Sequence, residues 1–563
     1  MINHKRIQLT KLALALSIAL SAAPTFAQNT TSAIGGRISG ADGKPAGGAT
    51  VSIVHTESGS VSNVVTDSEG RYVARGLRTG GPYTIIITKN GVTEKREGVY
   101  TQLAETAAVD ATLGAPIQSV TVTGSAARSE KFARTTMGSG TSIGATEILT
   151  QASIQRNLQD YARSDPRVSQ TDKERGEISV AGQNSRFNSM TIDGVAVNDT
   201  FGLESNGSPT ARQPISIEAI QSVQVNVANY DVTQKGYTGA NINAVTKSGT
   251  NTWKGAGYFV FRNDKLAGDR YNATTDTYSA PPRFKETTKG AWVSGPLVKD
   301  KLFFFALSEE FVSTRTAPDF GPIGSTAGTT VNIPQSAITG AQNIAQNTYG
   351  FDAGTTDVPA GTALTVRENL LKLDWNISDD HRMMARYSKT SQAEPQFPGV
   401  SASGVSLNSY FYSQQKTIET IVAQVFSDWT PTFSTELKAS SRTYDSIPKN
   451  NARLPSIGLS FSGPTPDGVP QSAARFINMG TELSRHNNVL ATDTIDLYAG
   501  ANWSVGNHEL KFGADMNKNK IYNAFLQNVN GTYTFSCVNE SATYQYNFTP
   551  VGQNLNCNPV GTF

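Results

Sequence analysis

The residues after Trp253 alternate between apolar and polar side chains, and this pattern limits the possible folds more than any other feature of the chain. Such alternation predicts β-strands with one apolar and one polar face. Segments of about ten residues have the length of a strand that crosses a bilayer at a tilt. We place such strands at Trp253–Arg262, Thr287–Gly295, Leu302–Phe311, Val366–Ile377, Arg382–Lys389, Thr417–Asp428, Ser434–Tyr444, Asp493–Trp503 and Glu509–Tyr522.

The connections between these strands have two lengths. Long connections, such as Val312–Thr365 and Asp445–Thr492, are rich in Gly, Pro, Ser and Asn. The short ones are Val298–Lys301, Ser378–His381, Thr430–Phe433 and Val505–His508. Short turns on one side and long loops on the other are typical of an outer-membrane β-barrel, whereas a solenoid would repeat its loops more evenly. We therefore interpret residues 252–563 as part of a transmembrane antiparallel β-barrel.

The composition agrees with a surface that faces lipid. Charged residues make up 17% of the chain, below the roughly 25% of soluble proteins, and there are 19 Tyr and 24 Phe. Aromatic residues form the interfacial girdles of membrane barrels. The net charge of +2 gives no strong field for nucleic acid. We predict outer-membrane lipid as a partner, and no nucleic acid.

Residues 1–27 are typical of a secretory signal peptide. A basic start is followed by the apolar run Leu12–Ala22 and by Thr25-Phe26-Ala27, a cleavage pattern before Gln28. The alternative, a membrane anchor, would need about 20 apolar residues. Export to an oxidising compartment would permit a disulfide between Cys537 and Cys557, which we expect to staple a surface loop.

Residues 33–113 predict a small β-sandwich that precedes the barrel. Turns rich in Gly, Pro and Asp separate strands at Ala49–Val54, Ser62–Thr66, Arg71–Arg75 and Tyr83–Thr88. The segments GRISGADGKPAGGATVSIV, TDSEGRYVARGL and GPYTIIIT resemble the carboxypeptidase regulatory-like domain. That resemblance implies a transthyretin-like, non-catalytic sandwich related to carbohydrate-binding folds. We expect Asp67 and Glu69 to lie in a solvated turn rather than a calcium site.

Aromatic residues in this sandwich are few, so carbohydrate capture is the weaker of two interpretations. Tyr72 and Tyr83 lie in predicted strands and are expected in the core, which leaves Tyr100. A role as spacer or coupling domain is favoured.

Residues 131–249 predict a mixed α/β globule rather than more barrel wall. Ser153 is a good N-cap for a helix whose apolar face contains Leu158 and Tyr161. A hairpin is predicted around Asp193-Gly194, then a short helix at Pro214–Ile220 that leads into a strand.

Two segments of this globule resemble the plug domain of TonB-dependent outer-membrane receptors. They are GEISVAGQNSRFNSMTIDGVAVND, from Gly176, and GYTGANINAVTKSGTN, from Gly236. SGPLVKDKLFFF, from Ser294, and ENLLKLDWNISDDHRMMARYS, from Glu368, are similar to the barrel of the Oar-like subgroup. The resemblance implies a gated barrel in the outer membrane of a Gram-negative bacterium, with the sandwich in the periplasm.

The linker at residues 114–130 contains the segment IQSVTVTGS. By resemblance it is a candidate TonB box, which would add as a strand to a periplasmic TonB-type energy-coupling protein. A flexible tether is the alternative. The candidate residues are Ile117, Gln118, Ser119, Val120, Thr121, Val122 and Thr123.

By the same resemblance, plug loops would face an unknown extracellular ligand. The candidate loops are Thr200–Gln213 and Gln183–Phe187. Within them, the side chains that we expect to face the substrate are Arg186, Phe187, Phe201 and Arg212. The alternative for the two arginines is that they pair with barrel carboxylates and hold the plug in place.

We find no catalytic motif in the sequence. GTSIG around Ser142 matches a nucleophile elbow, but the histidines that follow it lie in barrel turns or loops. No zinc-protease motif or P-loop is present. We therefore predict no enzyme activity, no catalytic residue, no cofactor and no metal site.

Nine or ten barrel strands are fewer than the roughly 22 of plugged barrels. We therefore expect the barrel to be incomplete here and the chain to be truncated at its C-terminus, despite the terminal Phe563. The resemblance to TonB-dependent receptors implies import of a scarce siderophore, glycan or peptide. The alternative is an Oar-like adhesion or surface-organising protein without active transport.

Overall fold

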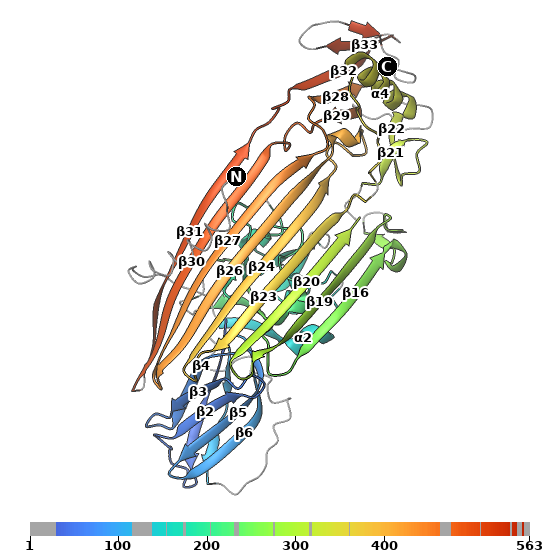
Figure 1. Cartoon of the computed structure of the whole chain (residues 1–563). Helices are drawn as coiled ribbons and strands as arrows, with labels where there is room; N and C mark the ends of the chain where they lie inside the picture. The colour runs from blue at the N-terminus through green and yellow to red at the C-terminus, as the bar shows by residue number, and fades with distance from the viewer. Residues whose placement is uncertain are drawn as a thin grey trace.

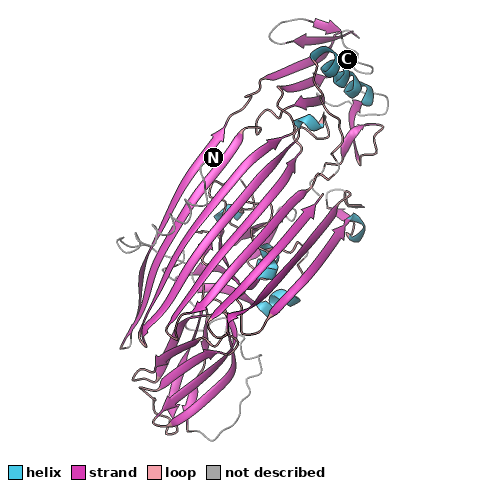
Figure 2. Ribbon diagram, viewed as in Figure 1, coloured by secondary structure: helices cyan, strands magenta, loops and turns pink. Residues whose placement is uncertain are grey.

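The computed structural model describes four bodies, shown by chain order in Figure 1 and by secondary structure in Figure 2. It describes residues 30–114, 138–461, 475–540, 543–548 and 554–556, except for gaps at 154, 173–175, 203, 230–232, 234–235, 274–275, 315–317, 360 and 507. The predicted signal peptide, the candidate TonB box, Cys557 and Phe563 lie outside the described residues, as does the side chain of Cys537. No helix within these ranges has both the length and the apolarity to cross a bilayer.

The largest body is a nine-stranded antiparallel sheet in which each strand pairs with its neighbours in the chain, in the order β16-β19-β20-β23-β24-β26-β27-β30-β31. Its strands are β16 Lys254–Asn263, β19 Lys285–Val298, β20 Leu302–Ser313, β23 Leu364–Asn376, β24 His381–Gln396, β26 Tyr412–Thr430, β27 Phe433–Asn450, β30 Asn488–Val505 and β31 His508–Phe525. All nine predicted strands are confirmed, and most extend beyond their predicted ends. Every second side chain along β23 is buried, and Leu370 packs into the core of the plug.

The N-terminal body is a sandwich of two four-stranded sheets, one ordered β4-β1-β7 with β8 beside β1, the other β3-β2-β5-β6. Its strands are β1 Ser32–Gly40, β2 Thr50–His55, β3 Val61–Val65, β4 Arg71–Leu77, β5 Gly80–Lys89, β6 Val92–Thr101, β7 Thr106–Ala108 and β8 Ala111–Leu113. Tyr72 and Tyr83 are in its core, as predicted, and Tyr100 is exposed. Asp67 accepts hydrogen bonds from the backbone of Glu69 and Arg71 within a turn.

The plug lies against the inner face of the barrel sheet (Figure 1). Its central sheet has the order β13-β12-β15-β14-β9. The elements are β9 Gly138–Gly144, α2 Ala145–Thr150, α3 Leu158–Ala162, β10 Val168–Asp172, β11 Glu177–Val180, η1 Ser185–Phe187, β12 Ser189–Ile192, β13 Val195–Ala196, η2 Ile217–Ala219, β14 Ile220–Asn229 and β15 Asn241–Thr246.

Two local predictions for the plug differ from the structure. The N-cap of α3 is Asn157, whose side chain accepts from the Asp160 backbone, whereas the predicted cap, Ser153, donates to the Asp160 carboxylate. The short helix predicted at Pro214–Ile220 is a single 3-10 turn, η2, because the strand β14 begins directly after it. The hairpin around Asp193 is confirmed, since β12 and β13 pair antiparallel.

The fourth body, here called the head, is built from the long connections and from residues after β31. It contains α4 Gln335–Tyr349 and a six-stranded sheet in the order β25-β29-β28-β32-β33-β34. The strands of the six-stranded sheet are β25 Gly404–Ser406, β28 Ser456–Phe461, β29 Arg475–Gly480, β32 Thr532–Glu540, β33 Thr543–Phe548 and β34 Asn554–Asn556. A separate parallel pair in the head consists of β21 Phe320–Ile323 and β22 Thr329–Pro334. One apolar core joins Ile338, Leu407 and Ile477, which belong to three different connections.

Candidate functional site

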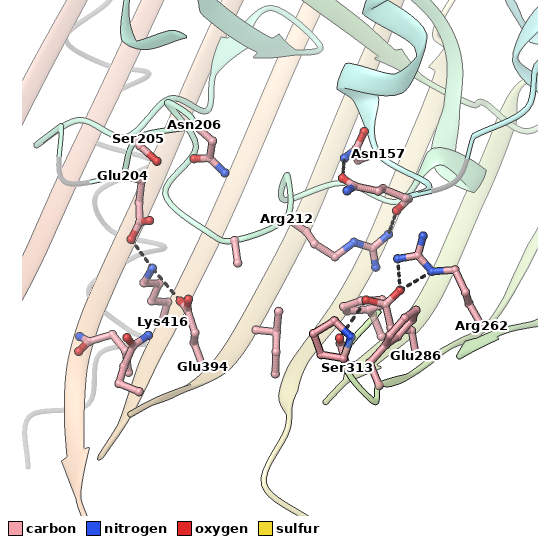
Figure 3. A pocket seen from close by; sticks show the side chains of 18 of the residues that line it. Asn157, Glu204, Ser205, Asn206, Arg212, Arg262, Glu286, Ser313, Glu394 and Lys416 are labelled. Atoms are coloured by element: carbon pink, nitrogen blue, oxygen red, sulfur yellow. Dashed lines mark hydrogen bonds and ion pairs between the residues drawn. The ribbon is translucent and has the colours of Figure 1, made fainter. Parts of the chain in front are cut away.

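The main cavity lies between the plug and the long-loop ends of the barrel strands and has a volume of about 1270 Å³. The barrel contributes residues near the ends of β16, β20, β24, β26 and β27 that lead into the long connections. The plug contributes residues 155–157, 186, 204–206 and 211–212. Figure 3 shows two groups of charged side chains that face each other across the cavity.

One group is centred on Lys416 of β26. Its ammonium pairs with Glu204 of the plug and lies 3.3 Å from Glu394 of β24. The Lys416 side chain is only 4% exposed, so both carboxylates are needed to offset the loss of water. Asp199 accepts the backbone N–H of Glu204 at 2.8 Å, which fixes the plug loop beside this group.

The second group contains Arg212 of the plug and Arg262 of β16. Arg262 pairs with Glu286 of β19, which also accepts a hydrogen bond from Ser313 at 3.0 Å. Arg212 donates to the carbonyl of Arg156 at 3.0 Å. Its guanidinium carbon lies 4.2 Å from the centre of the Phe311 ring, and a guanidinium nitrogen is 3.9 Å from a carboxylate oxygen of Glu309. Arg212 therefore both lines the cavity and contacts a barrel carboxylate.

Besides Arg270, three further exposed arginines line the cavity at its rim: Arg186 of η1, Arg283 before β19 and Arg485 before β30. Arg186 donates to the backbone carbonyl of Glu204 and Arg485 to the Asn488 side chain. None of the three forms an ion pair with another residue in the described ranges. Within that part of the chain, their positive charges therefore face the cavity mouth without a carboxylate partner.

The four predicted substrate-facing residues are divided by the structure. Arg186 and Arg212 line the cavity. Phe187 and Phe201 do not line it, although 53% and 40% of their surfaces are exposed. Sequence reasoning missed Arg283, Arg485 and Lys416, because they come from connections and from a strand remote from the plug motif.

A buried ion pair anchors the plug to the barrel. Arg386 of β24 lies 2.9 Å from Asp193 in the β12–β13 turn, and each side chain is 1% exposed. Burial acts to raise the pKa of Asp193, but the charges of Lys372 and Arg386 and two hydrogen bonds from Thr246 outweigh it and lower that pKa.

Barrel cations also hold the backbone around this turn. Lys372 donates to the carbonyl of Thr246, Lys438 to that of Gly194 and Arg442 to that of Ala196. The plug core extends into the barrel wall at Phe305, Leu307 and Leu370. Plug and barrel are therefore joined by apolar packing as well as charge.

Other chemistry has little support. Ser142 lies in the middle of β9, paired with Gln224, and not on a strand-to-helix turn. Among the described residues, no three His, Cys, Asp or Glu side chains are grouped as a metal site would require.

A membrane-type antiparallel sheet with an internal α/β plug and a polar cavity on its long-loop side defines a plugged outer-membrane barrel. Residues 245–557 match the family described as Outer membrane beta barrel domain. Residues 133–238 match TonB-dependent Receptor Plug Domain and residues 33–114 match Carboxypeptidase regulatory-like domain. The chain belongs to the TonB-dependent outer-membrane receptors and is related to their Oar-like subgroup.

Individual relatives are more distant. The chain is 32% identical over 133 residues to the TonB-dependent transporter Oar of Myxococcus xanthus, a match that covers 23% of this chain and 12% of Oar. The outer membrane transporter YddB from Escherichia coli is 13% identical with a TM-score of 0.46, over 74% of this chain and 52% of YddB. The siderophore receptor PirA from Acinetobacter baumannii is 15% identical with a TM-score of 0.42, over 69% of this chain and 49% of PirA. The chain thus spans about half the length of these solved structures.

Proposed function

We propose that this receptor imports an anionic solute across the outer membrane, driven by a periplasmic TonB-type protein. The observation that carries the proposal is the cavity between plug and long connections, with Arg186, Arg283 and Arg485 at its rim. A guanidinium presents a planar fork of donors that fits carboxylate and phosphate groups. Arginines without local carboxylate partners also raise the concentration of anions at the mouth.

The interior cations are paired, which leaves the first attraction to the rim arginines. Lys416, Arg212 and Arg262 all have carboxylates nearby, so they contribute little net attraction. The rim arginines would then make the first contact with the ligand, and the paired interior groups would follow as the plug moves. A siderophore or an acidic peptide carries suitable groups, whereas a neutral glycan does not.

Energy would enter from the periplasm. Residues Ile117–Thr123 remain the candidate TonB box, with the sandwich on the same side of the membrane. Strand addition of this segment to the coupling protein would transmit a pulling force through backbone hydrogen bonds.

The test separates binding from import. The probes are a ferric catecholate, an acidic peptide and a neutral maltooligosaccharide, each labelled. Deletion of Ile117–Thr123 should abolish uptake of the anionic probe and leave its surface binding unchanged. Uptake that persists in the deletion would contradict TonB coupling.

A rim variant tests the ligand class. Replacing Arg186, Arg283 and Arg485 by Gln should weaken binding of the anionic probe at least tenfold, with a smaller difference at high salt. The control, Lys44→Gln/Lys95→Gln/Lys299→Gln, removes the same charge from exposed positions outside the cavity lining. Equal losses in both variants, or tightest binding of the neutral probe, would contradict an anionic ligand.

The head favours a second candidate function, adhesion or surface organisation without active transport. A core shared by three connections gives this part of the molecule a fixed surface. A cell–cell or matrix phenotype that survives collapse of the proton motive force would support this function, and loss of the phenotype with the force would oppose it.

A further inference from the structure

The sandwich packs against the short-turn end of the barrel sheet, opposite the head (Figure 1). Glu57 accepts from the Lys254 ammonium of β16 at 2.9 and 3.0 Å. At the other edge of the sheet, Arg75 pairs with Glu509 of β31. Between them, Ser62 donates to Asp428 of β26 at 3.4 Å. The sandwich therefore contacts the rim from the first to the last strand of the nine-stranded sheet.

The sandwich also contacts the plug and the start of the barrel. Arg78 donates to the carbonyl of Gly249, at the junction of plug and barrel, and its guanidinium lies 5.4 Å from the centre of the Phe303 ring. A Cβ atom at Gly80 would lie 2.9 Å from the side-chain nitrogen of Gln221 in β14. Because this contact is so close, the β4–β5 turn covers the plug at Gln221, on the side of the plug that faces the short barrel turns.

The nature of this interface indicates that it is reversible. The core of the sandwich consists of residues between Ile34 and Leu113, with no barrel or plug residue. The ion pairs at its edges have side chains between 36% and 55% exposed. Between them, Asn376 of β23 donates to the Ser58 carbonyl at 3.3 Å and Gln424 of β26 donates to Thr30 at 2.8 Å, and both of these hydrogen bonds are buried. Exposed pairs stabilise by at most about 1 kcal/mol, and small polar interfaces between domains permit relative motion.

We propose that the sandwich is a detachable cap. Docked on the short-turn rim, it covers the face of the plug through which a solute or the plug itself would have to move. It opens by breaking two half-exposed ion pairs and a few hydrogen bonds rather than an apolar core.

Reactivity of a single thiol beneath the cap tests this proposal without any transported ligand. The background is Cys537→Ser/Cys557→Ser, so that Gln221→Cys supplies the sole thiol of the full chain in detergent. The readout is the rate at which a bulky polyethylene-glycol maleimide modifies this thiol. Charge reversal at Glu57→Lys and Arg75→Glu should release the cap and raise this rate about tenfold.

Two controls belong to the release experiment. Adding Lys254→Glu and Glu509→Arg restores opposite charges across both contacts and should return the rate toward that of the parent. Leu149→Cys, on α2 and 74% exposed, should react equally fast in every background. An unchanged rate for the thiol at position 221 after charge reversal would overturn the cap.

A cross-link tests detachment. A Cβ atom at Gly59 would lie 3.2 Å from the Cβ atom of Asp300, close to the 3.5–4.5 Å of a disulfide. Oxidised Gly59→Cys/Asp300→Cys should slow the modification of the thiol at position 221 at least tenfold. Gly59→Ser/Asp300→Ser, which carries the same left-handed backbone strain, should not. If the cross-linked protein reacts as fast as the serine control, the proposal that the sandwich detaches spontaneously is overturned.

Discussion

The barrel sheet contacts two other domains of the chain, the plug and the sandwich, and the two interfaces are built from different contacts. The plug is joined to it by a shared apolar core that includes Phe305 and by the buried Asp193–Arg386 pair. The sandwich is joined to it by half-exposed ion pairs and single hydrogen bonds. The two interfaces differ in how far water reaches their ion pairs. Removing one partner of a buried ion pair leaves the other charge uncompensated, whereas water hydrates the charge that remains when an exposed pair is broken.

This contrast suggests an order of events. The contacts that cost least to break are those of the sandwich, so the cap would open before the plug moves. The β12–β13 turn, held by several barrel cations, would be the last part of the plug to leave the wall.

The largest effect is expected at the buried pair. Asp193→Ala leaves Arg386 charged and unpaired, and should lower the free energy of unfolding of plug and barrel by about 3–5 kcal/mol. Urea titration in detergent measures this loss, followed by fluorescence in a background where Trp292, beside the plug core, is the sole tryptophan. Glu57→Ala is the matched control and should change the same transition by less than about 1 kcal/mol. Equal effects would remove the contrast between the two interfaces.

The apolar part of the plug interface should be nearly as sensitive. Phe305→Ala removes a ring that is fully buried, and should cost about 3–5 kcal/mol in the same titration. Phe259→Ala, on β16 and largely exposed, provides the comparison. A similar cost at both positions would show that the plug does not share a core with the wall.

Acid should weaken the sandwich before it weakens the plug interface. Burial, with the charges of Arg78 and Lys254, lowers the pKa of His55 to about 3. Protons therefore bind the unfolded sandwich in preference. The stability that neutral His55 gives the folded sandwich is fully present above about pH 6.5. It falls by about 1.4 kcal/mol per pH unit as the pH drops from there toward 3. Hydrogen exchange of sandwich amides at pH 7 and pH 5 measures the change after correction for intrinsic exchange. His55→Asn should reduce the loss of sandwich stability between pH 7 and pH 5 by about 2 kcal/mol.

The smallest effect is expected at the Glu57–Lys254 ion pair between the sandwich and β16. Glu57→Lys or Lys254→Glu alone should weaken docking by about 0.2–1 kcal/mol, and the double exchange should restore it. Exchange protection at the Gln221 amide, measured in low and high salt, reports this coupling. An effect as large as that of Asp193→Ala would show that the sandwich is a fixed part of the barrel.

Much of the fold follows from local pattern. The nine barrel strands were predicted because a strand in a lipid-facing sheet needs alternation, and the short turns between them fix its register. Gly-rich and Asp-rich turns located four sandwich strands, but β1, β6 and the three-residue strands β7 and β8 were missed. The β1 strand contains several glycines and β6 contains the charged run Glu94–Glu97, so neither shows an apolar alternation.

The site was only partly predictable. Arg186 and Arg212 were found because the plug motif places them in loops that face outward. Arg283, Arg485 and the sandwich contacts join residues far apart in the chain, and no local pattern encodes such pairs. The head was missed for the same reason, since Ile338, Leu407 and Ile477 make a core only after the strands between them have paired.

The shared core of the head has a consequence for immune recognition. Antibodies raised against peptides from one connection would meet those residues fixed beside residues of two others, in a shape that the free peptide does not hold. Hydrogen bonds from Ser409 to the Ala353 carbonyl and from the Gly480 backbone to Ser409 tie the three connections together. Epitopes on this surface are therefore discontinuous, and an immunogen would have to present the folded head rather than its separate pieces.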